Sequence, residues 1–305
     1  MRVALLFPGQ GAQRPGFLGR LPDHPQVHAT LAEAARILGR DPSRLDDAAA
    51  LRSTVAVQLS ATIAGVAAAR ALAAEGLVPD AVAGLSVGAF AAAVTCGTLS
   101  FPDVLRLVSL RAECMARAAP RGYGMMALLG VTERVAADLV ARVSDRSPLF
   151  LASVNGPTEV VVSGGDAALA AAAEEAHASG VSARRLQVSI PSHCPLMEGV
   201  SASLREAMSG VSVMRPAMPY ISNTRARVAA EGTEVADDLI HNVSRTVRWH
   251  DSVTLLYELG CRLFVEAPPG QVLTGLARAS FAGVRALALD EVPLATAVTL
   301  ARRDP

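Results

Sequence analysis

The stretch AVAGLSVGAFAAAVTCGTL, residues 81–99, contains no charged residue and is open to two interpretations. Its length and hydropathy approach those of a membrane-spanning helix, and Gly84 with Gly88 fits a GxxxG helix-packing motif. The same residues fit GxSxG, the sharp strand-to-helix turn that presents a nucleophilic serine. In that turn Gly84 and Gly88 let the strand and the helix approach each other, and Ser86 is the candidate nucleophile. The alternative is that Ser86 is a buried serine in a tight turn and has no catalytic role.

The surroundings of this stretch favour the turn. Ser86, Thr95 and the glycines make a poor lipid-facing helix, and no cluster of arginines marks a cytoplasmic flank. No other stretch of the sequence rivals it as a membrane span, and Pro8 interrupts the first apolar run too early for a signal peptide. We therefore expect a cytoplasmic protein with no membrane partner.

The composition of the chain narrows the classes of function. Its 305 residues are 51% apolar, which is ample for a large core, and the formal net charge is zero, so we expect no nucleic-acid partner. All 28 basic residues are arginine, which excludes a Schiff-base or P-loop lysine in this chain. The four cysteines are far apart, which argues against a zinc ribbon or a redox dithiol and favours a reducing compartment.

The order of expected elements indicates an α/β fold in two parts. Apolar strands alternate with helices, which is typical of a parallel sheet covered on both faces. Between residues 122 and 190 the order changes to β-α-β-β-α-β, the pattern of a ferredoxin-like unit. The expected strands of the large unit are 2–7, 81–84, 219–221 and 262–266, and those of the small unit are 125–131, 150–154, 159–163 and 183–190. We therefore expect residues 1–121 and 191–305 to form the large unit, with 122–190 inserted.

A serine nucleophile needs a base, and His193 has the most suitable position. It follows an expected strand in SIPSHCPLM, where Ser192 is expected to cap the next helix. Loops at the carboxyl ends of strands hold the sites of α/β sheets, and a helix N-terminus favours the neutral imidazole. A histidine that only fills the turn is the alternative. His24, His28 and His177 lie in polar stretches and are expected at the surface.

A nucleophile of this kind also needs an oxyanion hole. One donor is expected to be the backbone N–H of Val87, directly after the serine, and the loop GQGAQ, residues 9–13, is a candidate for the second. That loop is not a phosphate-binding loop, because it lacks GK[ST] and has Arg14 where GxGxxG requires glycine.

Arg111 is the most informative charge in the sequence. It lies on the apolar face of an expected helix, seven residues after Val104 and four before Met115, whereas Arg106 and Arg117 fall outside that face. A buried guanidinium needs an anionic partner. That partner is either an acidic residue of the chain, in a structural ion pair, or a substrate carboxylate held by two hydrogen bonds.

Six blocks, in order over nearly the whole chain, resemble the malonyl-CoA:acyl carrier protein transacylase family. They are FPGQGAQ (7–13), GLSVG (84–88), LRAECM (110–115), SVNGPTEVVVSG (153–164), PSHCPLM (191–197) and VEAPPGQVLTGL (265–276). The resemblance implies an α/β-hydrolase-like large subdomain with an inserted ferredoxin-like subdomain. It also implies Ser86 as nucleophile, His193 as base, and Gln10 with Val87 as oxyanion donors.

Three further roles follow from the resemblance. Arg111 would bind the malonyl carboxylate, a main-chain carbonyl at Asn242 would orient the histidine, and Asn155 would lie near the site. The implied reaction is ping-pong, from malonyl-CoA through a malonyl-serine to the phosphopantetheine-type thiol of an acyl carrier protein. No tightly bound cofactor or metal is implied, and a monomer is expected.

The elbow departs from the usual GHSLGE of this family. Its Leu85 and Ala89 make it similar to the transacylase (epsilon) subunit of bacterial malonate decarboxylase, whose carrier subunit is therefore the expected acceptor. The alternatives are a transacylase of fatty-acid or polyketide synthesis, a serine thioesterase, and a non-catalytic subunit that keeps the fold.

Overall fold

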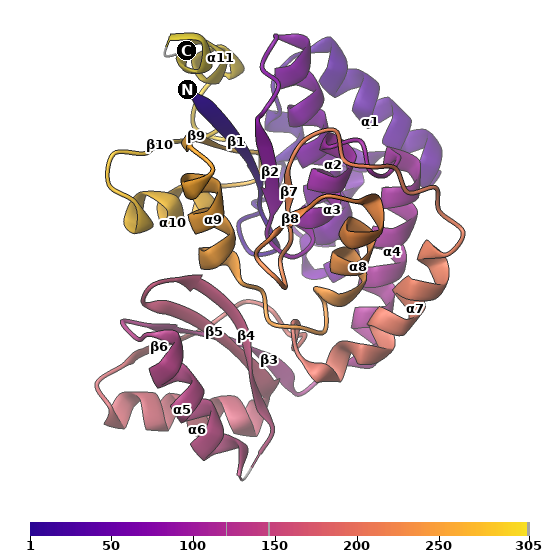
Figure 1. Ribbon diagram of the computed structural model, residues 1–305. Helices are drawn as coiled ribbons and strands as arrows, with labels where there is room; N and C mark the ends of the chain where they lie inside the picture. Colours follow the sequence, from indigo (N-terminus) through magenta and orange to yellow (C-terminus); the bar gives the residue numbers. More distant parts are fainter. Residues whose placement is uncertain (120, 146, 304–305) are drawn as a thin grey trace.

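The structure, a computed structural model, describes residues 1–119, 121–145 and 147–303, and it contains two sheets (Figure 1). The larger sheet has the order β10-β9-β1-β2-β7-β8, and its strands are parallel except for the β7–β8 pair. Its strands are β1 (Arg2–Phe7), β2 (Ala81–Gly84), β7 (Tyr220–Ile221), β8 (Val228–Ala229), β9 (Cys261–Glu266) and β10 (Arg285–Ala288). The predicted α/β fold with a mostly parallel sheet is confirmed.

Helices cover both faces of this sheet (Figure 1). They are α1 (Pro25–Leu38), α2 (Thr54–Ala74), α3 (Gly88–Thr95), α4 (Phe101–Ala118), α7 (Glu198–Met208), α8 (Gly232–His241), α9 (Trp249–Glu258), α10 (Val272–Ser280) and α11 (Leu294–Arg303). Because side chains alternate along a strand, Leu5 and Phe7 of β1 join the core beneath α2 and α3, while Ala4 and Leu6 join the core beneath α9 and α10. The central strand is therefore buried on both sides.

The charge-free stretch 81–99 divides into β2, a turn and the short helix α3. An eight-residue helix cannot span a membrane, so the predicted strand–turn–helix is confirmed. The expectation that no other stretch rivals it is wrong. Among the residues that the structure describes, α2 is long and apolar enough to cross a membrane, although 89% of that segment is buried inside the protein, as in a core helix.

The smaller sheet is antiparallel, with the order β4-β5-β3-β6, and α5 and α6 cover its face turned away from the large sheet (Figure 1). Its elements are β3 (Tyr123–Leu129), α5 (Glu133–Ser144), β4 (Leu149–Gly156), β5 (Glu159–Gly165), α6 (Asp166–Ala178) and β6 (Ser182–Arg185). This confirms the predicted ferredoxin-like order. The boundaries of the two parts at residues 121 and 190 stay a prediction.

Two details of the expected elements need correction. The last strand of the small sheet ends at Arg185 rather than 190, and after it the backbone N–H of Leu186 donates to the carbonyl of Met125 in β3. The sequence also gave no expectation of α8, although its start carries a capping box formed by Glu231 and Glu234. This helix proves to be central to the site.

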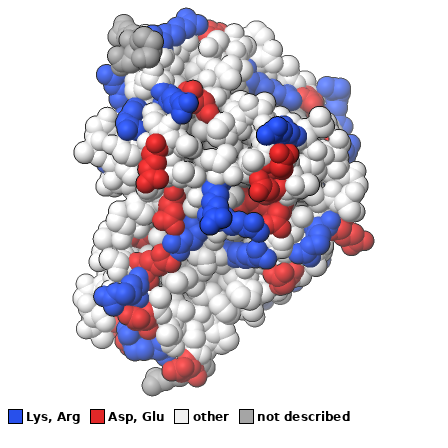
Figure 2. All heavy atoms as spheres, viewed as in Figure 1, with Lys and Arg blue, Asp and Glu red and all other residues white. Residues whose placement is uncertain are grey.

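The surface does not favour one sign of charge on the face viewed in Figure 1. Figure 2 shows arginines and acidic side chains interspersed across that face, in keeping with the net charge of zero.

Candidate active site

Ser86 lies at the sharp turn between β2 and α3 and has a φ of 56°, a conformation that residues with a side chain rarely adopt. Both flanking glycines are required by close approach. A Cβ added to Gly84 would lie 2.1 Å from the carbonyl carbon of Gly88, and one added to Gly88 would lie 2.2 Å from the carbonyl oxygen of Phe7. The GxSxG pattern therefore forms a strand–helix elbow with the serine at its tip.

Three groups hold Ser86 in the elbow. Its Oγ accepts a hydrogen bond from Nη2 of Arg111 at 3.2 Å, and its backbone N–H donates to Oδ1 of Asn223 at 2.9 Å. Its carbonyl accepts from Nδ2 of Asn242 at 3.4 Å. No hydrogen bond between the Ser86 hydroxyl and His193 occurs in the described structure.

Arg111 is buried in α4, with 1% of its surface exposed, and it has no carboxylate within ion-pair distance among the described residues. Its Nη1 donates to Oε1 of Gln58 at 2.5 Å, and its Nε has no described acceptor. Burial lowers the pKa of Arg111 to about 9, which leaves the guanidinium charged at neutral pH. The structural ion pair is thus absent from the described structure, and a buried cation beside the serine lacks its anion.

His193 is buried in the loop before α7, and its backbone N–H donates to the carbonyl of Val243 at 2.7 Å. Its Nδ1 forms a hydrogen bond with the carbonyl of Asn242. Since a carbonyl can only accept, Nδ1 carries the proton and the neutral ring presents Nε2 as the base. Burial, together with the charge of Arg111, lowers the pKa of His193 to about 4, against the opposing effect of the Asn242 carbonyl.

The cause of the neutral imidazole differs from the prediction. Ser192 caps no helix: the residue before the short 3-10 turn Pro195–Met197 is Cys194, which makes no side-chain cap, and α7 begins only at Glu198. Burial and a neighbouring cation therefore keep His193 neutral, rather than a helix N-terminus.

Acylation is expected to lose activity on the acid side with a midpoint near pH 4, because only the neutral His193 can accept a proton. The same shift affects stability. The folded pKa lies below the unfolded value of 6.5, so its contribution is complete above that pH and is lost as the pH falls toward 4. The measurement is kcat/KM for acylation against pH, with samples returned to neutral pH to check for unfolding. A reversible midpoint near 6.5 would contradict this environment for His193.

The two expected oxyanion donors are Val87, at the N-terminus of α3, and Gln10, in the loop that follows β1. No described group accepts a hydrogen bond from the backbone N–H of Val87 or of Gln10, so both remain available. The side chain of Gln10 continues a chain of contacts: Oε1 of Gln10 accepts from Oγ1 of Thr54 at 3.1 Å, which accepts from Nε2 of Gln58 at 3.0 Å. Gln58 in turn holds Arg111. Gln58 is not among the residues predicted from the sequence. The signal that could have found it is a polar amide in the middle of an otherwise apolar helix.

Gln10 and Thr54 also line an open cleft of about 490 Å³ between the two sheets' loops. The other side of this cleft is formed by Tyr123 and by residues 185–190, the last residue of β6 and the five that follow it. The lining of this cleft includes Gln10 but none of Ser86, His193 and Arg111.

Asn155 is not brought to the other candidate residues by any hydrogen bond in the described structure. It lies on β4, where its Oδ1 accepts from Ser153 at 2.6 Å and its Nδ2 donates to Glu159 at 3.2 Å. Its role stays a prediction. Among the histidines expected at the surface, His28 and His177 are exposed, but His24 is half-buried, and its Nδ1 caps the first turn of α1.

Comparison with known proteins gives the family and the reaction class, which the geometry of the site alone does not. The sequence matches the acyl transferase domain family over residues 4–304. It is 31% identical to the malonyl CoA-acyl carrier protein transacylase of Haemophilus influenzae, over 97% of this chain and 98% of that protein. The solved structure of the malonyl CoA-acyl carrier protein transacylase from Coxiella burnetii is 30% identical, covers 99% of this chain and 98% of its own, and has a TM-score of 0.94.

The chain belongs to the malonyl CoA-acyl carrier protein transacylase family. The predicted acyltransferase class and the two-part fold are therefore confirmed. Another solved transacylase, 30% identical with a TM-score of 0.93 over 98% of this chain and 100% of its own, is described as a malonyl-transacylase in complex with its type II polyketide synthase acyl-carrier protein.

These transacylases do not support the expectation of a malonate decarboxylase subunit. The alternative, a transacylase of fatty-acid or polyketide synthesis, fits them better. In the structure Leu85 packs against the protein's own core and Ala89 is fully buried within it.

Proposed function

We propose that this protein transfers a malonyl group from malonyl-CoA to the phosphopantetheine-type thiol of an acyl carrier protein, through an ester on Ser86. One observation carries the proposal: the buried guanidinium of Arg111 has no described carboxylate partner and lies 3.2 Å from the Ser86 hydroxyl. A malonyl group attached to that hydroxyl brings its free carboxylate to the cation. The substrate thus supplies the anion that the chain does not.

In the first half-reaction Nε2 of His193 takes the proton of the Ser86 hydroxyl as Oγ attacks the thioester carbonyl. The backbone N–H groups of Val87 and Gln10 donate to the oxyanion of the tetrahedral intermediate. The intermediate collapses to the malonyl ester, and the coenzyme A thiolate leaves with the proton held by His193. The Asn242 carbonyl keeps that imidazole in the required tautomer throughout.

Substrate binding also frees the nucleophile. Before binding, the Ser86 hydroxyl accepts a hydrogen bond from Nη2 of Arg111. A carboxylate is a stronger acceptor for a guanidinium than a hydroxyl, so the malonyl group displaces that contact and the hydroxyl can turn to His193. In the second half-reaction the carrier thiol gives its proton to His193 and attacks the ester, and His193 returns that proton to the Ser86 oxygen as it leaves.

The acceptor is proposed to be an acyl carrier protein of fatty-acid or polyketide synthesis. The experiment offers purified carriers with their thiol arm to the malonylated enzyme: a fatty-acid carrier, a polyketide carrier and a malonate decarboxylase carrier subunit. We expect transfer to one or both of the first two and none to carriers that lack the arm. Transfer to the decarboxylase carrier alone would overturn this choice, and steady release of free malonate without any carrier would indicate a thioesterase instead.

A further inference from the structure

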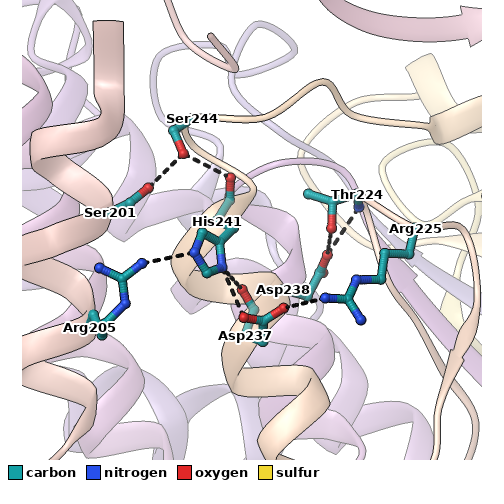
Figure 3. A network of polar contacts seen from close by, with 8 residues as sticks. All are labelled: Ser201, Arg205, Thr224, Arg225, Asp237, Asp238, His241 and Ser244. Atoms are coloured by element: carbon teal, nitrogen blue, oxygen red, sulfur yellow. Dashed lines mark hydrogen bonds and ion pairs between the residues drawn. The ribbon is translucent and has the colours of Figure 1, made fainter. Parts of the chain in front are cut away.

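Asp238 is a buried carboxylate on α8 whose partners among the described residues are hydrogen-bond donors rather than cations. Its Oδ1 accepts from the backbone N–H and the hydroxyl of Thr224, at 3.0 and 3.1 Å (Figure 3). Its Oδ2 accepts from the backbone N–H of Asn223 at 3.0 Å, from Nδ2 of Asn223 at 3.3 Å, and from the hydroxyl of Tyr220 at 2.8 Å. This one side chain therefore fixes the loop that follows β7.

Asn223 connects this carboxylate to the nucleophile. Its Nδ2 points to Asp238, so its Oδ1 points the other way, where it accepts the backbone N–H of Ser86 at 2.9 Å. The orientation of the amide is determined by chemistry, because the carboxylate only accepts here and a backbone N–H only donates. This hydrogen bond is made to Ser86 itself. Its φ of 56° is a strained conformation that the surrounding residues must hold in place.

The same end of α8 also holds the base. Asn242 follows Asp238 by one helical turn, and its backbone N–H donates to the Asp238 carbonyl at 2.8 Å. Its own carbonyl forms the hydrogen bond to His193. One short segment therefore contacts the nucleophile through Asn223 and the base through Asn242.

Two further hydrogen bonds tie this segment to α7 (Figure 3). Nη2 of Arg205 contacts Nε2 of His241 at 2.9 Å, and the hydroxyls of Ser201 and Ser244 lie 2.8 Å apart. Since α7 follows directly on the loop of His193, these contacts keep the end of α8 in register with the base.

We propose that Asp238 is a positioning residue for acyl transfer, which acts through Asn223 to hold the backbone of Ser86 in its reactive position. The inference rests on the proposed role of Ser86 as nucleophile. The proposal gives the buried carboxylate of Asp238 a function, although no carboxylate serves as acid or base in the proposed reaction.

The test is a double-mutant cycle of Asp238→Asn and Asn223→Ala, with the rate of Ser86 acylation by malonyl-CoA as the readout. An amide at 238 has one acceptor oxygen where the carboxylate has two, so its NH2 group meets donors of Asn223 or of Thr224 and the loop that presents Asn223 to Ser86 is displaced. We expect each single variant to slow acylation by about 10²-fold with KM for malonyl-CoA unchanged, and the double variant to be no slower than either single variant. Thr224→Val is the matched control, since it removes a hydrogen bond to the other oxygen of Asp238 and should keep the wild-type rate.

Three results would overturn the proposal: a wild-type rate in either folded single variant, effects that multiply in the double variant, or a Thr224→Val variant as slow as Asp238→Asn. If Asp238→Asn fails to fold, as judged by circular dichroism, Asn223→Ala alone decides, because it keeps the carboxylate and its other donors. Failure of the proposed function is separate, since it would appear as full activity in Ser86→Ala.

Discussion

Replacing Ser86 with alanine is expected to abolish malonyl transfer, with a fall in kcat of about 10⁶-fold, as when the nucleophile of a serine protease is removed. The hydroxyl at the tip of the elbow is the atom that carries the acyl group between the two thiols, and no described residue beside it offers a substitute. Fold and substrate binding should survive, because alanine removes a single oxygen and leaves the backbone contacts to Asn223 and Asn242 in place. The measurement is the rate of carrier malonylation with purified variants.

Ser53→Ala is the matched control for this variant. Ser53 is an exposed serine directly before α2, near the cleft, and its side chain makes no capping hydrogen bond. It should transfer malonyl at the wild-type rate. An active Ser86→Ala variant, or an inactive Ser53→Ala variant, would contradict the assignment of the nucleophile.

Replacing Arg111 with alanine is expected to reverse the preference of the enzyme from malonyl toward acetyl groups. Removing one partner of a buried charged pair costs about 2–5 kcal/mol, or roughly 30- to 5000-fold in kcat/KM for malonyl-CoA. Acetyl-CoA has no carboxylate to lose, and it no longer meets a buried unpaired cation, so its transfer should hold or improve. The measurement is the ratio of kcat/KM for the two thioesters.

Two controls separate this effect from general damage. Arg106→Ala removes an exposed arginine of the same helix and should leave the ratio unchanged. Gln58→Ala removes the hydrogen bond to Nη1 but keeps the charge, so the preference for malonyl should persist at a lower rate. An unchanged malonyl-to-acetyl ratio in Arg111→Ala would exclude the guanidinium as the ligand of the carboxylate.

Much of this site could be predicted from local sequence. The elbow is specified by residues within five positions, since Gly84 and Gly88 leave no room for a Cβ. Arg111 could be found because helical periodicity places it among Val104 and Met115 on the buried face. Both predictions rest on residues close together in the sequence. The structure confirms the elbow and the burial of Arg111.

The rest depends on contacts that periodicity does not encode. The low pKa of His193 arises from burial and from Arg111 on a distant helix, so no local pattern could give its cause. The strand β8 is two residues long, too short to show alternation, and it was not predicted. Asp238 and Asn223 meet only after α8 packs beside the loop that follows β7, and sequence offered no reason to pair them.

The choice of acceptor was also beyond local sequence. It was inferred from Leu85 and Ala89, which pack inside this chain. A carrier protein instead meets the enzyme at its exposed surface.

The central claim is that Ser86 carries a malonyl ester. The most direct measurement is to mix the enzyme with malonyl-CoA without a carrier, stop the reaction with acid, and locate the acyl group by mass spectrometry of the digested chain. We predict one malonyl group on the peptide that contains Ser86, and none in the Ser86→Ala variant. A malonyl group on another residue, such as the thiol of Cys194 beside the base, or transfer without any acyl-enzyme, would contradict the account.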